Sequence, residues 1–428
     1  MCDISPVISD GHAYPPDLVD FTLEQWPAGS PLGVTRDQLG HVLSECFLAS
    51  LTTDEGRPVR FRLLLTPHDA LPTEGEPNRG VLKLRFESSR ALESDELRRL
   101  SPAVPFETSL IGAHLEGSDL RIWGIAHSGA AWLAPSGGGR NSGVMWTRAP
   151  IIHVTGPGRV AVRSAGQLVA GLERGALISS AMDVFESRWL SELFARALED
   201  MLREHRDAAD PALMSGVIKG SLVQTLTQHL VRRVVRLIRG AGHGGMILIA
   251  EVEEALRFRD GLGAVRLKYT FADEEPRSRY RALLRRLMTA LGASARTGSV
   301  GWDDFQAADD PALAELEQSV FEISRLIASL ASIDGAVLLN KRFDLIGFGA
   351  EVSAELVAPR KVWRAIDIEG ESRQCDLAES VGTRHRAAYR FVQHHPRGLA
   401  VVISHDGAVR FVASLDNGVT YWEQSVSP

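Results

Sequence analysis

The spacing of apolar residues changes once along this chain of 428 residues, near position 180. Before about 175, short runs of Val, Ile, Leu and Phe are separated at close intervals by Gly, Pro, Asn and Asp, which is typical of strands joined by turns. After Ser179, apolar residues recur at helical spacing, as in Leu222, Leu226 and Leu230. Together with the chain length, this change predicts two domains rather than one core.

Residues 1–180 are expected to form a β-rich α+β domain. Residues 1–35 are rich in Pro, Gly and Asp, so we expect an irregular lead-in with one short helix near 18–26. The runs predicted as strands are Val59–Leu65, Gly80–Phe86, Ser109–Leu115, Leu120–Ala126, Ala131–Leu133, Ile151–Thr155, Val160–Arg163 and Leu168–Leu172. Their close spacing favours an antiparallel sheet.

Residues 181–428 alternate helical and strand patterns, which predicts an α/β domain with a mixed sheet flanked by helices. Helices are expected at 185–205, 220–239 and 313–330, and strands at Met246–Ala250, Val265–Thr270, 336–339, Phe343–Phe348, Leu399–Ser404 and Val409–Ala413. Asp406-Gly407 is a hairpin signal between the last two strands. Residues 251–310 are interpreted as an insertion within this domain.

Composition excludes several classes of protein. A hydrophobic fraction of 44% and a charged fraction of 24% are those of a folded, soluble chain. A formal charge of −7 provides no general attraction to nucleic acid or to an anionic membrane. The three cysteines lack metal-ligand spacing, and no apolar stretch is long enough to span a membrane. We therefore expect a cytoplasmic protein with neither nucleic acid nor membrane as a partner.

The segment from Gly382 to Arg386, Gly-Thr-Arg-His-Arg, begins a helix-compatible stretch. A helix N-terminus presents free backbone N–H groups and the positive end of the helix dipole. Thr383, Arg384, His385 and Arg386 add donors that suit phosphate oxygens. The alternative is a capped helix with a solvated basic first turn, but positive charge there opposes the dipole unless an anion is bound. The segment favours an oligophosphate site.

Asp334 stands at the start of an apolar strand and is followed by Gly335, which can let a ligand approach the backbone. An Asp before Gly is more often a turn residue. Beside a phosphate site, however, it suits nucleotidyl transfer, which needs a carboxylate that holds a metal ion next to the attacking hydroxyl.

Together these segments resemble the diadenylate cyclase (DAC) family, whose hallmarks are an Asp-Gly-Ala strand and a later Gly-Thr-Arg-His-Arg segment, here at 334–336 and 382–386. Weaker parallels are the 220–239 helix leading into 244–249, and the strand 401–404. The resemblance covers about 185–428. The whole arrangement is also similar to bacterial proteins with a DACNV-type sensor region, which would make residues 1–180 a regulatory module for an unknown ligand.

The resemblance implies condensation of two ATP molecules into cyclic di-AMP with release of pyrophosphate, supported by Mg or Mn. Asp334 would ligate the metal and help to activate the attacking 3′-hydroxyl. The implied catalytic residues are Asp334, Arg384, His385 and Arg386, and the implied ATP-binding residues are Gly335, Val352, Thr383, Arg384, His385, Arg386 and Ser404. Two catalytic domains would face each other, since each ATP supplies a hydroxyl to the other, so self-association is implied.

One departure from the family concerns the metal. Many membrane-associated members have Ser-Glu at the end of the later strand, where this chain has Ser404-His405. Asp406 can substitute, although a turn with Gly407 is favoured, so the preference between Mg and Mn stays open. Two other functions also stay open: a catalytically silent sensor of ATP or a cyclic dinucleotide, and a protein-binding scaffold. The intact Asp334 favours the enzyme over the silent sensor.

Other motifs favour a structural interpretation. The glycine-rich run 136–140 lacks the Lys-Ser/Thr of a phosphate loop, and 242–245 is interpreted as a helix end. The tryptophans Trp123, Trp132 and Trp146 are expected to pack in a core, and the arginines Arg232, Arg233, Arg236 and Arg239 to form a solvated helix face.

Overall fold

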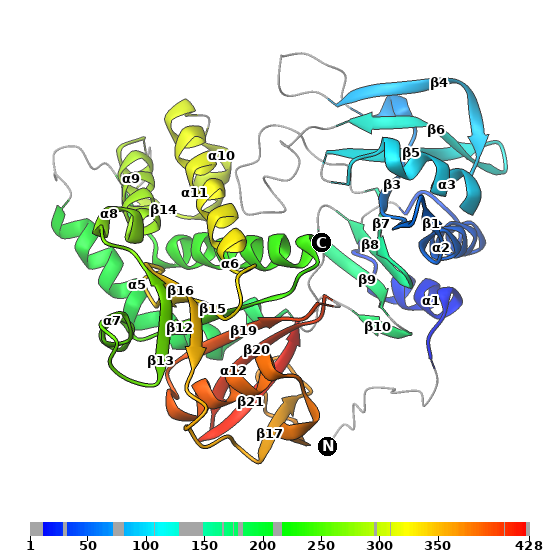
Figure 1. The fold of residues 1–428 in the computed structure, drawn as a ribbon. Helices are drawn as coiled ribbons and strands as arrows, with labels where there is room; N and C mark the ends of the chain where they lie inside the picture. The colour runs from blue at the N-terminus through cyan, green and yellow to red at the C-terminus, as the bar shows by residue number, and fades with distance from the viewer. Residues whose placement is uncertain are drawn as a thin grey trace, which may run out of the picture. The chain divides into compact units, whose positions relative to one another are not determined.

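The computed structural model describes residues 12–28, 32–71, 81–106, 108–127, 149–164, 167–173, 175–178, 183–208, 216–294, 298–308, 310–405 and 407–424. The described residues fall into two compact units, one ending at Ile178 and the other starting at Asp183 (Figure 1). Among the described residues, no helix is long and apolar enough to cross a membrane.

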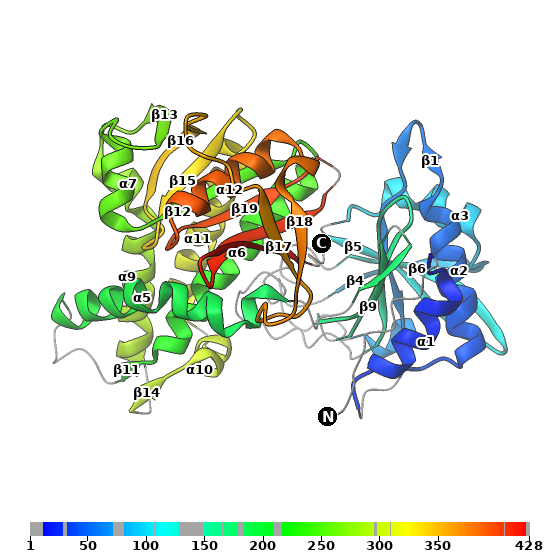
Figure 2. The ribbon, with the colours of Figure 1, turned by 90° about the horizontal axis from the view of Figure 1, so that it is seen from below.

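The first unit is an eight-stranded sheet with three helices on one side (Figure 2). The helices are α1 (Pro15–Gln25), α2 (Arg36–Ser50) and α3 (Ser94–Leu100). The strand order is β10-β9-β8-β7-β3-β5-β6-β4. The strands are β3 (Phe61–Leu65), β4 (Leu82–Ala91), β5 (Ser109–Glu116), β6 (Asp119–His127), β7 (Ile151–Gly156), β8 (Arg159–Ser164), β9 (Gln167–Glu173) and β10 (Ala176–Ile178). A separate hairpin joins β1 (Thr53–Asp54) to β2 (Arg57–Pro58).

The β-rich character predicted for this region is confirmed, but its details differ from the prediction. The strands predicted between 59 and 172 correspond to β3–β9, apart from Ala131–Leu133, which lies outside the described residues. The sheet is not wholly antiparallel, because β3 and β5 are parallel. A parallel pair needs a crossover, and the long connection through α3 and β4 supplies it.

Helix α2 was not predicted, although its start carries a local signal. Thr35 accepts a hydrogen bond from the backbone N–H of Gln38, and the Gln38 side chain accepts one from the backbone N–H of Thr35. This reciprocal pair is a capping box. Leu39, Val42 and Leu43 on this helix are fully buried against the sheet.

Trp123 packs in the core of the first unit, as expected. Its side chain is 3% exposed, and its indole N–H donates to the carbonyl of Thr66 at 2.9 Å. The ring lies over Gly112, where a Cβ would come within 2.0 Å of it. Trp132 and Trp146, like the glycine-rich run 136–140, lie outside the described residues.

The second unit is built on a nine-stranded mixed sheet with the order β13-β16-β15-β12-β19-β20-β21-β17-β18. Its strands are β12 (Gly245–Ala250), β13 (Val265–Thr270), β15 (Ala336–Asn340), β16 (Leu345–Val352), β17 (Lys361–Ala365), β18 (Arg373–Leu377), β19 (Leu399–Ile403), β20 (Val409–Leu415) and β21 (Gly418–Gln424). The pairs β12–β15 and β17–β21 are parallel, and the other neighbours are antiparallel.

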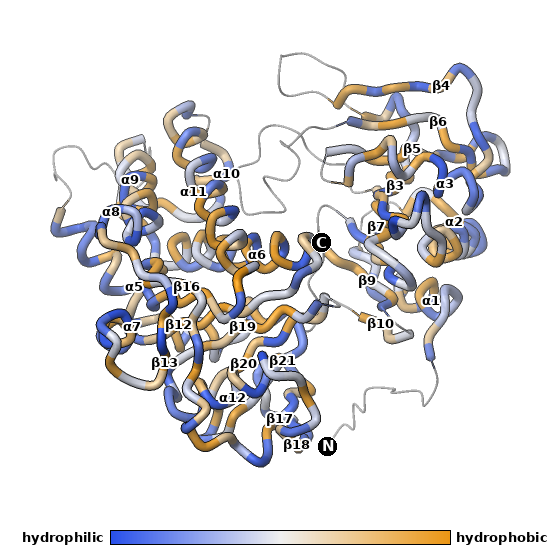
Figure 3. The backbone as a smooth tube through the Cα atoms, in the orientation of Figure 1, coloured by the Kyte–Doolittle hydropathy of each residue, from blue (hydrophilic) through white to orange (hydrophobic). Residues whose placement is uncertain are grey.

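Helices cover both faces of this sheet. One face packs on α5 (Arg188–Ala208), α6 (Gly220–Ala241), α9 (Arg279–Ser294) and α11 (Pro311–Leu330), and the other on α7 (Val252–Arg259) and α12 (Thr383–His394). Alternate residues of β12 serve the two layers: Ile247 and Ile249 face the first group, and Met246 and Leu248 the second. Such a strand must be apolar on both sides, and the hydrophobic colouring of the sheet agrees (Figure 3).

The segment 251–310, interpreted from sequence as an insertion, is part of this compact unit. It supplies the edge strand β13 and the helix α9, whose Leu283, Leu287 and Leu291 are buried in the main core. Its shorter elements are α8 (Glu274–Arg277), β14 (Ser299–Val300) and α10 (Trp302–Ala307), and β14 pairs with β11 (Val217–Ile218).

The arginine face of α6 is not the solvated face that we expected. Arg232 pairs with Asp183 at 2.6 Å, and its guanidinium carbon lies 4.3 Å from the ring centroid of Phe185 in the short helix η5 (Val184–Glu186). Arg233 stacks on Phe321 of α11 at 3.7 Å, and burial lowers its pKa to about 9. The prediction was wrong because η5 and α11 pack over this face.

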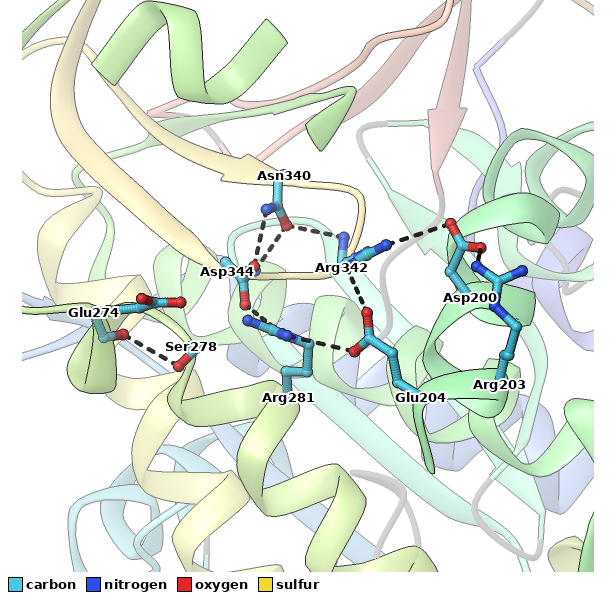
Figure 4. A network of polar contacts seen from close by, with 9 residues as sticks. All are labelled: Asp200, Arg203, Glu204, Glu274, Ser278, Arg281, Asn340, Arg342 and Asp344. Carbon is cyan, nitrogen blue, oxygen red and sulfur yellow. Dashed lines mark hydrogen bonds and ion pairs between the residues drawn. The ribbon is translucent and has the colours of Figure 1, made fainter. Parts of the chain in front are cut away.

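A polar network holds the turn between β15 and β16 (Figure 4). Arg342 in this turn pairs with Glu204 of α5 at 2.6 Å, and Arg281 of α9 pairs with Asp344 at 3.1 Å. The Asn340 side chain accepts the backbone N–H groups of Arg342 and Asp344. The network ties both helices to the end of β15 that lies away from Asp334, so its role is to hold the scaffold.

Candidate functional site

Three neighbouring strands of the second sheet meet at one edge, where β15 and β12 begin and β19 ends. Ile247 of β12 is opposite Val337 of β15, and Gly245 is opposite Ile403 of β19. Continuing these registers by one to three residues places Asp334, Gly244 and Ser404 in one row across the strands. Because adjacent strands are about 4.8 Å apart, the row brings together residues that are far apart in sequence.

Asp334 is exposed at this edge, and Gly335 next to it is tightly packed. Gly335 has a φ of 113°, and a Cβ there would lie 2.6 Å from the carbonyl carbon of Gly349 in β16. The glycine therefore allows close approach of a neighbouring strand. This packing accounts for the glycine without the ligand approach that we expected from sequence.

The basic segment forms the first turn of α12, as predicted. Gly382 is the N-cap, no side chain caps the helix, and no acidic residue lies in its first turn. Thr383 and Arg386 are exposed, whereas Arg384 and His385 are half-buried. The free backbone N–H groups, the helix dipole and the cationic side chains all attract negative charge, so this helix end favours the binding of an anion.

Arg384 reaches the turn that joins α6 to β12. Its Nη1 donates to the carbonyl of His243 at 3.4 Å, and a Cβ on Gly244 would lie 2.8 Å from the same nitrogen. Gly242, with a φ of 75°, ends α6 in the left-handed conformation, which confirms the predicted helix end. The glycine-rich turn therefore both ends the helix and leaves room for Arg384.

Val352 and Ser404 lie on either side of Asp334. Val352, half-buried at the end of β16, belongs to the same apolar cluster as Val381 and Ala387, which flank the first turn of α12. The backbone N–H of Ser404 donates to Ala408 at 2.8 Å within the β19–β20 hairpin. His405 is exposed, and Asp406 lies outside the described residues. The structure thus gathers every residue implied by the resemblance at one edge: Asp334, Gly335, Val352, Thr383, Arg384, His385, Arg386 and Ser404.

Sequence reasoning missed a charged group beside Asp334. Glu351 of β16 pairs with Arg266 and with Lys268 of β13, both at 2.8 Å. The hydrogen bond to Glu351 and, more weakly, the charge of Asp334 raise the pKa of Lys268. No local signal could have found this group, because it depends on the pairing of β13 with β16 across 85 residues of sequence.

The described residues contain no group of three His, Cys, Asp or Glu side chains placed to hold a metal ion. Mg²⁺ seldom uses such a protein cage, because it keeps several waters and binds one or two carboxylates together with substrate phosphates. The exposed carboxylate of Asp334, next to a cationic helix N-terminus, fits a cation that arrives with a polyphosphate.

Comparison with known proteins gives limited matches. No curated protein matches the chain. A solved structure that matches is the crystal structure of the hypothetical membrane spanning protein from Bacillus cereus, a structural genomics target. The match has 15% identity, a TM-score of 0.22, and covers 56% of this chain and 93% of that chain. At this TM-score the likeness supports no conclusion about fold or function.

The first unit has a family match. Residues 33–127, which run from before α2 to the end of β6, match the family model described as "Probable sensor domain DACNV". This match supports the sensor part of the resemblance found from sequence, and places it on the β-rich unit.

Proposed function

We propose that the second unit is a diadenylate cyclase that condenses two ATP molecules into cyclic di-AMP, and that the first unit regulates it. The observation that carries the proposal is the convergence of Asp334, from the loop before β15, with the first turn of α12 at one sheet edge. Asp334 and Gly382 are 48 positions apart in sequence. Gly244 is the neighbour of Asp334 in the row across the strands, and it also lies next to Arg384, so it connects the two segments in space. The family resemblance of both segments supports the same chemistry.

The reaction transfers two nucleotidyl groups. The 3′-oxygen of each ATP forms a bond to the α-phosphorus of the other and loses its proton, while the bond from that phosphorus to the pyrophosphate oxygen breaks. Two ATP molecules become one cyclic di-AMP and two pyrophosphates. In this scheme Thr383, Arg384, His385 and Arg386 hold the triphosphate, and the charges of the two arginines stabilise the negative charge that builds up on the leaving pyrophosphate.

Asp334 is the residue that would hold a divalent cation, and Mg or Mn would supply charge neutralisation at the phosphates. The chain's own contribution is to place this carboxylate beside the phosphate-binding turn. Ser404, whose backbone is held in the hairpin, would contact the nucleotide from β19, and Val352 would contribute an apolar surface for the adenine.

The proposal includes self-association, because one sheet edge supplies only one nucleotide site. Asp334, Thr383 and Arg386 are exposed, which fits half of a composite site that is completed when two such edges face each other. Regulation by the first unit would then act on how often two half-sites meet, since a regulator changes rate only by biasing a state of the catalytic unit. The DACNV match supports this sensor role.

The decisive experiment incubates the purified chain with ATP and Mn²⁺ or Mg²⁺ and identifies the products by mass spectrometry. Cyclic di-AMP and pyrophosphate in a ratio of about one to two are the expected products. ATP binding without any product would favour the silent nucleotide sensor. Absence of ATP binding would overturn both functions.

A further inference from the structure

The chain enters the second unit at η5, which is docked on helix α6 and on the end of strand β21. Asp183, just before η5, pairs with Arg232 of α6 at 2.6 Å, and Arg232 also pairs with Glu186 at 3.5 Å. The Gln424 side chain of β21 accepts the backbone N–H of Val184 and donates to Asp183. The segment through which the chain arrives from the first unit is thus held by two elements of the second.

Phe185 is the apolar part of this docking. Its side chain is 5% exposed, its ring centroid lies 4.3 Å from the guanidinium carbon of Arg232, and it meets the ring of Phe411 in β20 edge-on. The Gln228 side chain of α6 donates to the carbonyl of Phe185 at 2.8 Å. A cavity of about 30 Å³ lies beside the ring. Because a cavity leaves the side chains that line it with fewer contacts, η5 is easier to undock than a close-packed segment.

Helix α6 connects this docking to the candidate site. From Arg232 the helix continues to Ala241, about 14 Å along its axis. In the turn that follows, the carbonyl of His243 accepts a hydrogen bond from Arg384, which extends over Gly244. Since a close-packed helix moves as a unit, a shift of α6 at Arg232 also moves the turn against which Arg384 lies.

Strand β21 gives a second connection, which ends beside the same turn. Gln424 is opposite Val409 of β20. Val409 is opposite Ile403 of β19, which is opposite Gly245 of β12. This row of residues adjoins the row that contains Gly244. η5 packs on the sheet face opposite α12, so it acts on the site through the positions of α6 and of these strand ends and not by contact with a nucleotide.

We propose that the docking of η5 on α6 is a latch that holds Arg384 in place, so that the state of the junction with the first unit sets the affinity for ATP. The inference rests on the proposed nucleotide site and deepens its regulation. With η5 docked, α6 and the turn before β12 support Arg384. Release of η5 loosens this turn and weakens nucleotide binding, because a regulator acts by biasing a state of the site that it controls.

The test breaks the latch from each side in the full-length chain. Asp183→Asn and Arg232→Gln each remove the ion pair, the double variant removes both partners, and Arg232→Lys keeps the pair. Arg373→Gln is the matched control. Arg373 is 21% exposed, pairs with Asp416 at 2.8 Å and lies over the ring of Trp363, so it has the same kinds of contact as Arg232, but with β17 and the turn after β20.

Hydrogen exchange is measured by mass spectrometry without nucleotide, and ATP affinity by calorimetric titration without divalent cations. We expect Asp183→Asn and Arg232→Gln to speed exchange several-fold in residues 236–245 and 399–405 but not in 252–270. Both should raise the Kd for ATP about threefold. The double variant should match the single variants, since all three lack the same interaction. Arg232→Lys should recover most of the affinity.

Arg373→Gln should behave as the wild type in both measurements, and effects equal to those of Arg232→Gln would overturn the latch. Unchanged exchange in 236–245 would also overturn it, as would faster exchange throughout the second unit, which indicates general destabilisation. Faster exchange with unaltered ATP affinity would show that Arg384 does not depend on η5. No ATP binding by the wild type would overturn the nucleotide site and the inference with it. The expected differences in affinity without any cyclic di-AMP would leave the latch standing and overturn only the cyclase activity.

Discussion

Arg384 extends over Gly244, so that its Nη1 lies 2.8 Å from the point that a Cβ on this glycine would occupy. The carbonyl oxygen of Ile403 lies at the same distance from that point, and the backbone nitrogen of His405 at 3.0 Å. Gly244 in the turn, the Arg384 side chain of α12 and the end of β19 are thus packed against one another. The turn that ends α6 therefore helps to decide where the Arg384 guanidinium, which is proposed to bind phosphate, lies.

Replacing Gly244 with Ala should both strain the backbone and displace Arg384. Gly244 has a φ of 65°, which costs a residue with a Cβ about 1 kcal/mol, and the contacts with Ile403 and His405 add to this. We expect a lower unfolding midpoint and weaker ATP binding. Gly240→Ala in α6 is the matched control, because nothing lies within 4 Å of its Cβ position and Ala favours a helix. Unchanged ATP affinity in Gly244→Ala would show that the position of Arg384 does not depend on the turn.

Asp334→Asn should abolish formation of cyclic di-AMP and leave the fold intact. The side chain is exposed, so an amide of equal size has little effect on stability, whereas it removes the charge proposed to hold the cation. Product formation is measured by mass spectrometry at saturating Mn²⁺, with thermal unfolding as the check on folding. Wild-type activity in this variant would remove Asp334 from the proposed mechanism.

A shortened chain that starts at Asp183 should fold, bind ATP and show a cyclase rate that depends on protein concentration differently from the full chain. The physical reason is that the second unit has its own core, while the first unit is proposed to influence the pairing of half-sites. Rates per protomer are measured over a range of concentrations for both chains. The same rate and the same concentration dependence in both would remove the support for regulation.

The starting residue of that shortened chain matters. The backbone N–H of Val184 donates to the Gln424 side chain at 2.7 Å, and Gln424 donates to Asp183 at 3.0 Å. Val184 and Phe185 are 0% and 5% exposed. A chain that starts at Arg188 loses both apolar side chains and should be less stable by roughly 3 kcal/mol or more, which chemical denaturation can measure.

Acid should destabilise the protein through His229. Burial, followed by the charges of Arg232, Arg233 and Arg236, lowers the pKa of His229 to about 3. Below the ordinary pKa of 6.5, the unfolded chain binds a proton that the folded chain does not, so the free energy of unfolding decreases as pH falls from 6.5 toward 3. The decrease between pH 6.5 and pH 5 should be about 2 kcal/mol.

The control for this pH effect is His229→Phe, because Phe keeps a ring that can stack on Trp302. In the wild type the ring centroids of His229 and Trp302 are 5.1 Å apart. Urea denaturation at pH 7 and pH 5 should show a smaller pH dependence in this variant than in the wild type. Some dependence should remain, because burial also lowers the pKa of His205. Identical pH dependence in the two proteins would assign the effect to other groups.

Most strands with strong apolar patterns could be predicted from sequence, but the largely buried β21 was missed, as were β17 and β18. β12 and β19, buried along their whole length, were predicted within one residue. β17 and β18 were missed because exposed and buried positions alternate irregularly along β17, β18 has no buried position, and polar or charged residues interrupt both. Their place in the sheet depends on pairing with β21 and with each other, which no local pattern contains.

The sequence by itself determined the two kinds of unit, most of the main helices and inner strands, and the two segments that are proposed to bind a nucleotide, because period, turn residues and short motifs are local properties. Only the tertiary structure decided that Asp334, the first turn of α12 and Ser404 share one edge. That outcome depends on strand order and register, which bring Gly244 between Asp334 and Ser404. The contact between Lys268 and Glu351 was decided in the same way, since pairing between distant strands is set by the packing of the whole sheet.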